Sequence, residues 1–265
     1  MTAHTWDPDR YLTYADERGR PFVDLLGRIG ATDPRSVVDL GCGPGNLTDL
    51  LADRWPRARV QGLDSSPEMI AAAGARGQRV EYAVGDVRTW TPEADVDVVV
   101  SNATLQWVPG HRELLPRLLS CLAPGGWLAF QVPGNQDQPS HLIRGELAAE
   151  TPYAEHTAAV AVPSAHDPLD YYDALADAGA EDLDVWETTY THVLTGPDPV
   201  FTWVSGTGAR PTLQALPADL RPAFETELRR RLSRAYPTRP DGTVLLPFRR
   251  VFAVARRPSS GRTGG

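Results

Sequence analysis

The stretch from Val37 to Gly45, with the sequence VVDLGCGPG, most constrains how this chain can fold. Two β-branched valines and a leucine suit a short strand that is buried on both faces of a parallel sheet. Gly41, Gly43 and Gly45 then permit a sharp turn and leave no side chains between the backbone and a ligand. A helix that starts near Asn46 would point its N–H groups at this turn, which favours negatively charged ligand groups.

The spacing of these glycines is G-x-G-x-G, so the dinucleotide-binding pattern G-x-G-x-x-G fits less well. A phosphate-binding P-loop is excluded because it needs a lysine and the chain has none. Asp64 closes the next predicted strand, where an acidic side chain can bind a pair of ribose hydroxyls. The loop and Asp64 together predict a nucleoside-binding edge, and the alternative is an ordinary turn between a strand and a helix.

Strand and helix signals alternate through the first half of the chain. Strands are predicted at about 37–40, 58–64, 80–84, 96–100 and 127–132. Between them, helices are predicted at about 47–55 and 111–122, and a further helix is predicted to start near Ser65. Ser65 and Glu68 have the spacing of a capping box at one helix start, and residues 123–126 read as a turn. This alternation predicts an α/β fold with a doubly wound, mostly parallel sheet.

The second half of the chain departs from this rhythm. It contains a helix at 168–178, two long strands at 184–194 and 244–255, and two irregular, mainly helical blocks at 133–166 and 195–243. We therefore expect a single domain over 1–265, with an N-terminal helical lid at 1–30, a cofactor-binding core at 31–132 and a substrate cap formed by the two irregular blocks. By composition, residues 259–265 are expected to be a disordered tail.

Charge and composition exclude several classes of protein. The net charge of −8 argues against a nucleic-acid footprint, although a local basic pocket remains compatible with it. All 26 basic residues are arginine, which suits bidentate recognition of carboxylates. Two cysteines and six scattered histidines give no disulfide framework and no metal site. Without a signal peptide or a membrane-length apolar run, we expect a cytoplasmic monomer that binds neither nucleic acid nor membrane.

The DLGCGPGN loop, Asp64 and the Gly85–Asp86 pair together resemble class I S-adenosylmethionine-dependent methyltransferases, which have this Rossmann-like fold. The resemblance extends to the trans-aconitate 2-methyltransferase family through segments spread over nearly the whole chain: Trp6–Pro8 with Tyr11, Arg18–Pro21, Leu63–Pro67, Ser101–Trp107, Trp186–Tyr190 with His192, Trp203–Val204 with Thr207–Gly208, Arg210–Pro211 and Val254–Arg257. Two departures concern the substrate pocket: Arg249 replaces an expected proline, and 151–166 is divergent.

The resemblance implies that S-adenosylmethionine is bound along the strand ends of the core and beneath the N-terminal lid. Asp64 is expected to hold the ribose, and Asp86 the adenine amino group, with a solvated turn residue as the alternative for Asp86. Met69 is expected in the core, with contact to a purine face as the alternative, and Cys42 is expected to be a small filler of the loop. The cofactor-binding residues predicted in this way are Trp6, Tyr11, Asp39, Gly41, Cys42, Gly43, Asp64, Ser65, Met69, Asp86, Val87, Asn102, Ala103, Gln106 and Trp107.

The implied reaction is transfer of a methyl group to one carboxylate of trans-aconitate or a related tricarboxylate. A carboxylate is ionised at neutral pH, so no general base and no catalytic acid–base residue are expected, only positioning. Arginines would hold the spare carboxylates; each has a surface charge or a structural ion pair as its alternative. The predicted substrate-binding residues are Arg20, Arg144, Tyr190, His192, Trp203, Arg210 and Arg250.

Three other functions remain open from the sequence. The chain could methylate a different carboxylate, a phenol or a carbon acceptor. It could bind S-adenosylmethionine without catalysis, although the polar and aromatic segment Asn102–Trp107 and the arginines of the cap argue against this. Finally, it could methylate nucleic acid, but the sequence has neither the basic character of a nucleic-acid-binding surface nor the Asn-Pro-Pro-aromatic motif that binds a flipped base.

Overall fold

The structure is a computed structural model that describes residues 15–77 and 79–259. The predicted lid residues Trp6 and Tyr11 lie outside the described residues, as does nearly all of the predicted tail. The chain divides into two compact units. Unit 1 comprises Met1–Pro133, Ala165–Thr188 and Arg250–Gly265, and unit 2 comprises Gly134–Ser164 and Thr189–Arg249.

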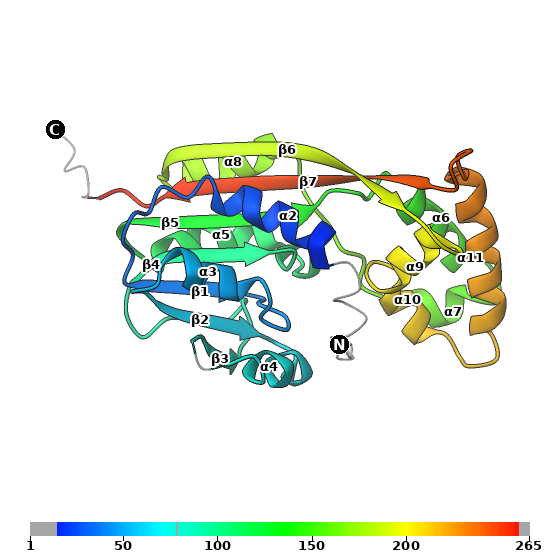
Figure 1. The fold of residues 1–265 in the computed structure, drawn as a ribbon, viewed down its shortest axis with the longest axis horizontal. Coiled ribbons are helices and arrows are strands. Elements are labelled where there is room, and N and C mark those ends of the chain that lie inside the picture. The colour runs from blue at the N-terminus through cyan, green and yellow to red at the C-terminus, as the bar shows by residue number, and fades with distance from the viewer. Residues whose placement is uncertain (1–14, 78, 260–265) are drawn as a thin grey trace. The chain divides into compact units, whose positions relative to one another are not determined.

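Unit 1 is built on a seven-stranded sheet with the strand order β3-β2-β1-β4-β5-β7-β6 (Figure 1). The strands are β1 (Ser36–Leu40), β2 (Arg59–Asp64), β3 (Glu81–Val84), β4 (Val96–Asn102), β5 (Leu122–Pro133), β6 (Glu181–Leu194) and β7 (Val244–Arg256). β1 to β5 pair in parallel, and β7 is antiparallel to β5. This confirms the predicted doubly wound, mostly parallel α/β fold.

Helices cover both faces of this sheet, as parallel strands require. The helices of unit 1 are α2 (Ala15–Leu26), α3 (Thr48–Arg54), α4 (Pro67–Gly74), α5 (His111–Ser120) and α8 (Pro168–Asp177). Figure 1 shows α2 and α3 on one face and α5 and α8 on the other. Leu115 and Leu118 of α5 and Leu175 of α8 are fully buried against Val99 and Phe130 of the sheet. This apolar core is the rigid support for the loops at the strand ends.

Two local predictions were wrong. The N-cap of α4 is Ser66 and not Ser65: Ser66 Oγ accepts the Met69 N–H at 3.2 Å, and Pro67 occupies the first helical position. Ser65 is exposed instead. In addition, residues 123–126 were predicted to be a turn before a strand that starts at Trp127. In the structure, β5 already begins at Leu122, and residues 123–126 form an irregularity within it, because both Leu122 and Trp127 pair with β4.

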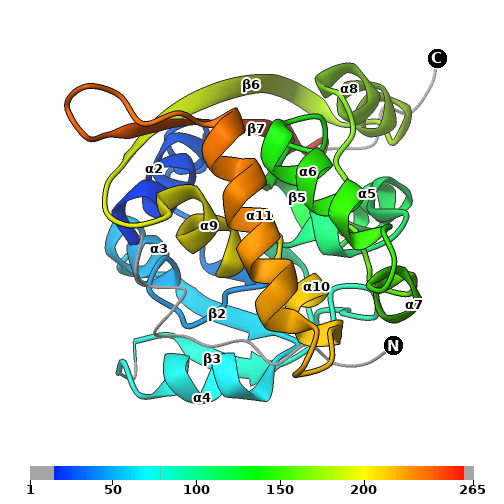
Figure 2. The same ribbon diagram turned by 90° about the vertical axis from the view of Figure 1, so that its right-hand side faces the viewer.

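Unit 2 contains five short helices and the adjoining ends of β6 and β7. The helices are α6 (Pro139–Ala148), α7 (Ala154–Thr157), α9 (Pro199–Ser205), α10 (Arg210–Ala215) and α11 (Arg221–Ala235). α11 packs along α6 and α9, as Figure 2 shows. Phe224, Leu228 and Leu232 recur on one face of α11 and are buried, whereas its arginines form ion pairs such as that of Arg231 with Glu150.

No helix within the described ranges is long and apolar enough to cross a membrane.

Candidate active site

The glycine loop after β1 is held against the end of β2 by main-chain and side-chain hydrogen bonds. The N–H groups of Gly41 and Cys42 donate to Leu63 O at 2.7 and 2.9 Å. Asp64 then accepts the N–H of Gly43 at 2.9 Å and the N–H of Ser66 at 2.9 Å, one on each carboxylate oxygen. Asp64, at the end of β2, therefore holds the glycine loop in place. It also lies at the sheet edge where parallel α/β sheets bind ligands.

Two glycines of the loop, Gly41 and Gly43, have different structural roles. Gly41 has a φ of +83°, and a Cβ there would lie 2.0 Å from Thr104 Oγ1, so the loop and the segment after β4 are in contact. At Gly43, which has a φ of +56°, no atom of the described residues lies within 4 Å of such a Cβ. Gly43 is therefore the point at which a ligand can approach the main chain closely.

Asp39 is a buried carboxylate at the end of β1. Thr48 Oγ1 donates to its Oδ2 at 2.7 Å, but Oδ1 has no hydrogen-bond partner among the described residues. Burial raises the pKa of Asp39 to about 7, against the bond from Thr48, which lowers it. Gln106 Oε1 is a second buried acceptor without a described partner, and its Nε2 donates to Ala103 O at 2.6 Å.

Unpartnered buried acceptors are costly, so Asp39 and Gln106 are suited to receive donors from a ligand. The amino group of an amino-acid ligand, such as the methionine part of S-adenosylmethionine, is such a donor. With the open approach at Gly43, this donor preference fits the predicted cofactor. Burial and the nearby carboxylates of Asp39 and Asp64 raise the pKa of the Cys42 thiol, which makes Cys42 a filler and not a nucleophile.

The end of β3 carries the predicted adenine contact. Asp86 forms a bidentate ion pair with Arg88, which holds the pKa of that carboxyl below its usual range. Arg117 of α5 donates to Val87 O and Trp90 O and so holds the loop that follows β3. Asp86 is half-buried and its adenine contact stays a prediction. Met69, the other predicted purine contact, is buried on α4.

The segment after β4 turns sharply at Ala103, whose φ of +54° is rare for a residue with a side chain. Its N–H donates to Gln131 O at 3.0 Å. Gln131 Nε2 also donates to Asn102 Oδ1 at 2.6 Å, and Arg250 NH1 donates to Gln131 Oε1 at 3.4 Å. The predicted cofactor residue Asn102 and the predicted substrate residue Arg250, both of unit 1, are thus joined by one intervening amide.

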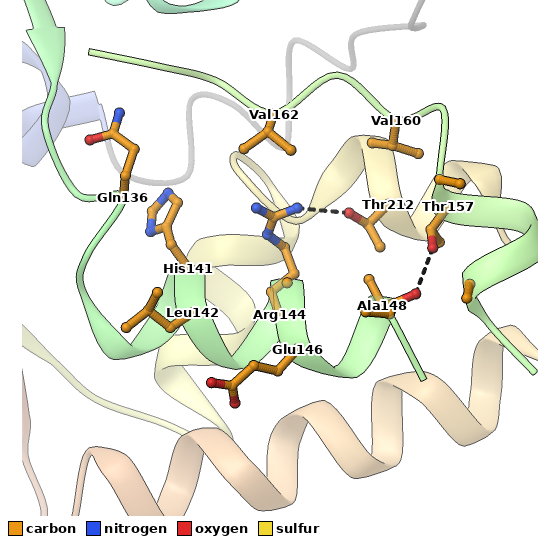
Figure 3. A pocket seen from close by; sticks show the side chains of 14 residues that line it. Gln136, His141, Leu142, Arg144, Glu146, Ala148, Thr157, Val160, Val162 and Thr212 are labelled. Atoms are coloured by element: carbon orange, nitrogen blue, oxygen red, sulfur yellow. Dashed lines mark hydrogen bonds between the residues drawn. The ribbon is translucent and has the colours of Figure 1, made fainter. Parts of the chain in front are cut away.

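Unit 2 contains a cavity of about 570 Å³ along α6 (Figure 3). Arg144 and His141 of α6, Thr212 of α10 and an apolar wall that includes Val160 and Val162 line it. Arg144 is only 6% exposed, and NH1 donates to Thr212 Oγ1 at 3.0 Å. Its Nε has no hydrogen-bond partner, and among the described residues no carboxylate forms an ion pair with it. Glu146 also lines the cavity, and Figure 3 shows its side chain on the opposite side of α6 from that of Arg144.

The cavity therefore combines a buried cation, Arg144, with polar side chains and an apolar wall. Burial, and to a lesser extent the charge of Arg144, lower the pKa of His141 to about 4, so the imidazole is neutral at neutral pH. Burial also lowers the pKa of Arg144, although a guanidinium remains charged. A buried cation without a counter-ion has a high desolvation cost, which an anionic group of a ligand would offset.

The other predicted substrate residues of unit 2 are divided between a buried aromatic cluster and a helix start. The rings of His192 and Trp203 lie 4.4 Å apart, and Phe248 packs edge-on against Trp203. Tyr190 is also buried on β6, whereas Arg210 is half-buried at the start of α10. In unit 1, Arg20 is exposed on α2.

Sequence reasoning missed three polar residues of these sites: His141, Thr212 and Gln131. His141 precedes Arg144 by three positions, the spacing of neighbours on one helix face, and this could have indicated it. Thr212 and Gln131 are brought to their arginines only by the fold, so no local signal pointed to them. Among the described residues, no group of three or more His, Cys, Asp or Glu side chains could hold a metal ion.

Comparisons with known proteins agree with this architecture. The methyltransferase domain family matches residues 37–126. A trans-aconitate 2-methyltransferase from Rhodococcus jostii is 53% identical over 254 residues, covering 95% of this chain and 99% of the relative. One from Mycobacterium sp. (strain KMS) is 54% identical over 262 residues, with 95% and 99% covered. In fold, the chain is similar to the YcgJ protein of Bacillus subtilis, with a TM-score of 0.60 at 10% identity over 91% and 99% of the two chains.

The sheet order, the glycine loop and the acidic residues at the strand ends define a class I methyltransferase, the class whose methyl donor is S-adenosylmethionine. At more than half identity over almost the full length, the chain belongs to the trans-aconitate 2-methyltransferase family. The predicted fold class, family and enzyme class are thereby confirmed.

Proposed function

We propose that this protein transfers the methyl group of S-adenosylmethionine to one carboxylate of trans-aconitate, or of a closely related tricarboxylate, and forms a methyl ester. The printed names of the relatives motivate the acceptor. The observation that carries the proposal is Arg144, a buried guanidinium that lines a cavity and forms no ion pair with a described carboxylate. A polycarboxylate acceptor has spare anionic groups for such a cation.

The cofactor supplies an activated methyl group when it is bound at the strand ends of unit 1. Asp39 and Gln106 would accept from its amino group, Asp64 would accept from its ribose, and Gly43 would let it approach the loop. These residues bind and orient, and none of them needs to remove a proton. The acceptor carboxylate is already the nucleophile at neutral pH, so catalysis rests on alignment and on exclusion of water.

Arg144, supported by Thr212, would hold one carboxylate of the acceptor. The neutral imidazole of His141 can offer a hydrogen bond to that carboxylate without adding a second buried charge. Arg250 and Arg210 are the further candidates for the remaining carboxylates. Of the other predicted residues, Arg20 is exposed and has the weakest support from its surroundings.

The test is incubation of the purified protein with methyl-labelled S-adenosylmethionine and a panel of di- and tricarboxylates, monocarboxylates and phenols. We expect base-labile label in the tricarboxylates, with trans-aconitate the best acceptor by kcat/KM. Label transferred to a phenol or a carbon acceptor in preference would contradict the proposal. An Arg144→Met variant that uses a monocarboxylate as well as the parent protein, but loses the preference for tricarboxylates, would support the assigned role of Arg144.

A further inference from the structure

Gln131 occupies a buried position between two groups of the candidate active site. It lies near the end of β5 and is 1% exposed. In the sheet it is paired with Asn102 of β4 on one side and with Phe252 of β7 on the other. Arg250 lies two residues from Phe252 along β7, so its side chain projects from the same face of the sheet as that of Gln131.

The directions of the hydrogen bonds through Gln131 follow from the chemistry of Arg250. A guanidinium can only donate, so the group of Gln131 that faces Arg250 must be the acceptor Oε1. The amide Nε2 then faces Asn102 and donates to Oδ1 at 2.6 Å. Asn102 Oδ1 is thereby occupied as an acceptor, and the Asn102 amide retains Nδ2 as the donor for a ligand.

Gln131 also holds the main chain of this segment. Its carbonyl accepts the N–H of Ala103, the residue with the unusual positive φ. Next along the chain, Thr104 Oγ1 lies 3.2 Å from Gly41 O and 3.3 Å from Asn102 O. The side chain of Gln131 therefore contacts Asn102 and the buried cation Arg250, while its main-chain carbonyl holds the segment whose next residue, Thr104, contacts the glycine loop.

We propose that Gln131 is a positioning residue that orients the Asn102 amide as a donor and holds the Arg250 guanidinium in register with it. This rests on the proposed function, together with the predictions that Asn102 contacts the cofactor and that Arg250 contacts the acceptor. Only a group that donates on one side and accepts on the other can do this. A carboxylate cannot donate to Asn102 and would neutralise Arg250, while an apolar side chain would do neither.

Two substitutions separate these properties. Gln131→Met keeps the volume and removes both hydrogen bonds. Gln131→Glu keeps the shape of the side chain but places a carboxylate oxygen opposite Asn102 Oδ1. Because two acceptors cannot hydrogen-bond, the Asn102 amide should rotate so that its NH₂ group faces the carboxylate. The new negative charge should also pair with Arg250. When protonated, the introduced carboxylic acid again donates with its O–H and accepts with its C=O, as the amide does. The matched control is Gln61→Met, a glutamine on β2 of the same sheet that takes no part in this network.

The experiment measures three quantities for each protein: the melting temperature, the Kd for S-adenosylhomocysteine, and kcat and KM for the best acceptor of the panel. We expect both Gln131 variants to lose roughly tenfold to a hundredfold in kcat at saturation, as when orientation is lost. Their Kd should rise by about threefold to tenfold, the loss of about one hydrogen bond. Gln61→Met should match the parent protein.

The pH profile distinguishes positioning from mere packing. Relative to the parent protein, Gln131→Glu should regain activity and affinity as the pH falls from about 8 to about 5 and its carboxyl group takes up a proton, whereas Gln131→Met should not. Unchanged Kd and kcat in both variants, or equal pH-independent losses that follow a lowered melting temperature, would overturn the role of Gln131. A parent protein that methylates no carboxylate would contradict the proposed acceptor instead, and the Kd values would still decide the role of Gln131.

Discussion

Replacement of Arg144 by methionine should change stability and activity in opposite directions. The guanidinium is buried, has one described hydrogen bond to Thr212, and has no ion pair with a described carboxylate. Replacing a buried ion by an apolar side chain of similar size is often neutral or stabilising by roughly 1–4 kcal/mol, and losing the bond to Thr212 costs about 1.5 kcal/mol. We therefore expect the free energy of unfolding without ligand to stay constant or rise by about 1–2 kcal/mol.

The same substitution should impair use of the acceptor. Loss of a desolvated contact between Arg144 and a carboxylate should lower kcat/KM for trans-aconitate by about 2–4 kcal/mol, or roughly 30-fold to 1000-fold. In the parent protein, trans-aconitate at about one hundred times its Kd should raise the free energy of unfolding by about 2.7 kcal/mol. The variant should show little of this rise, because it lacks the group that binds the ligand.

Denaturant unfolding with and without trans-aconitate, combined with steady-state kinetics, measures both effects. Arg231→Met is the matched control, since Arg231 also lies in unit 2 but is paired with Glu150 and Glu227. That control should retain its kinetics and its stabilisation by ligand. If Arg144→Met unfolds more easily by more than about 3 kcal/mol, Arg144 is a structural cation, and if kcat/KM is unchanged, the cavity is not where the acceptor binds.

The remaining predictions concern the cofactor side. Asp64→Ala should weaken S-adenosylmethionine binding by about 1.5–3 kcal/mol in calorimetry with EDTA present, and unchanged affinity would exclude a ribose contact. With the Asp39 pKa near 7, kcat/KM for S-adenosylmethionine should fall below about pH 7, while kcat stays flat from neutral to mildly alkaline pH; a steadily rising kcat would favour a phenol acceptor. Because the pKa of Asp39 is higher in the folded than in the unfolded chain, the folded chain binds an extra proton between about pH 4 and about pH 7. The free energy of unfolding without ligand should therefore decline as the pH rises through this range, and Asp39→Asn should abolish that decline. Gly41→Ala should lower the melting temperature because its Cβ meets Thr104, whereas Gly43→Ala should chiefly weaken cofactor binding; the reverse pattern would refute these roles.

Local sequence patterns determined the sheet of unit 1 and the position of its ligand-binding edge. A run such as Val37–Leu40 followed by glycines encodes its strand and turn within a few residues, so no distant contact is needed to recognise it. The same holds for Asp64, because the end of a parallel strand places a side chain at one edge of the sheet wherever that strand lies. The patterns misplaced element boundaries: the N-cap of α4, which is Ser66, and the start of β5, which is Leu122. At both places neighbouring residues are competing candidates for one cap or one strand start.

Only the tertiary structure decided which arginines are buried and what they contact. Arg144, Arg210 and Arg250 were candidates of equal rank in the sequence, with Arg20 less favoured. In the structure Arg20 is exposed and Arg210 is half-buried, whereas Arg144 and Arg250 are 6% and 5% exposed. The desolvation of a charged side chain depends on residues that are distant in the sequence and pack around it in the fold. The periodicity of the local sequence carries no information about these residues. Gln131 meets Arg250 across 119 positions, and Arg144 meets Thr212 across 68. Partners at such distances are selected by strand pairing and helix packing, so their chemistry became visible only in the folded chain.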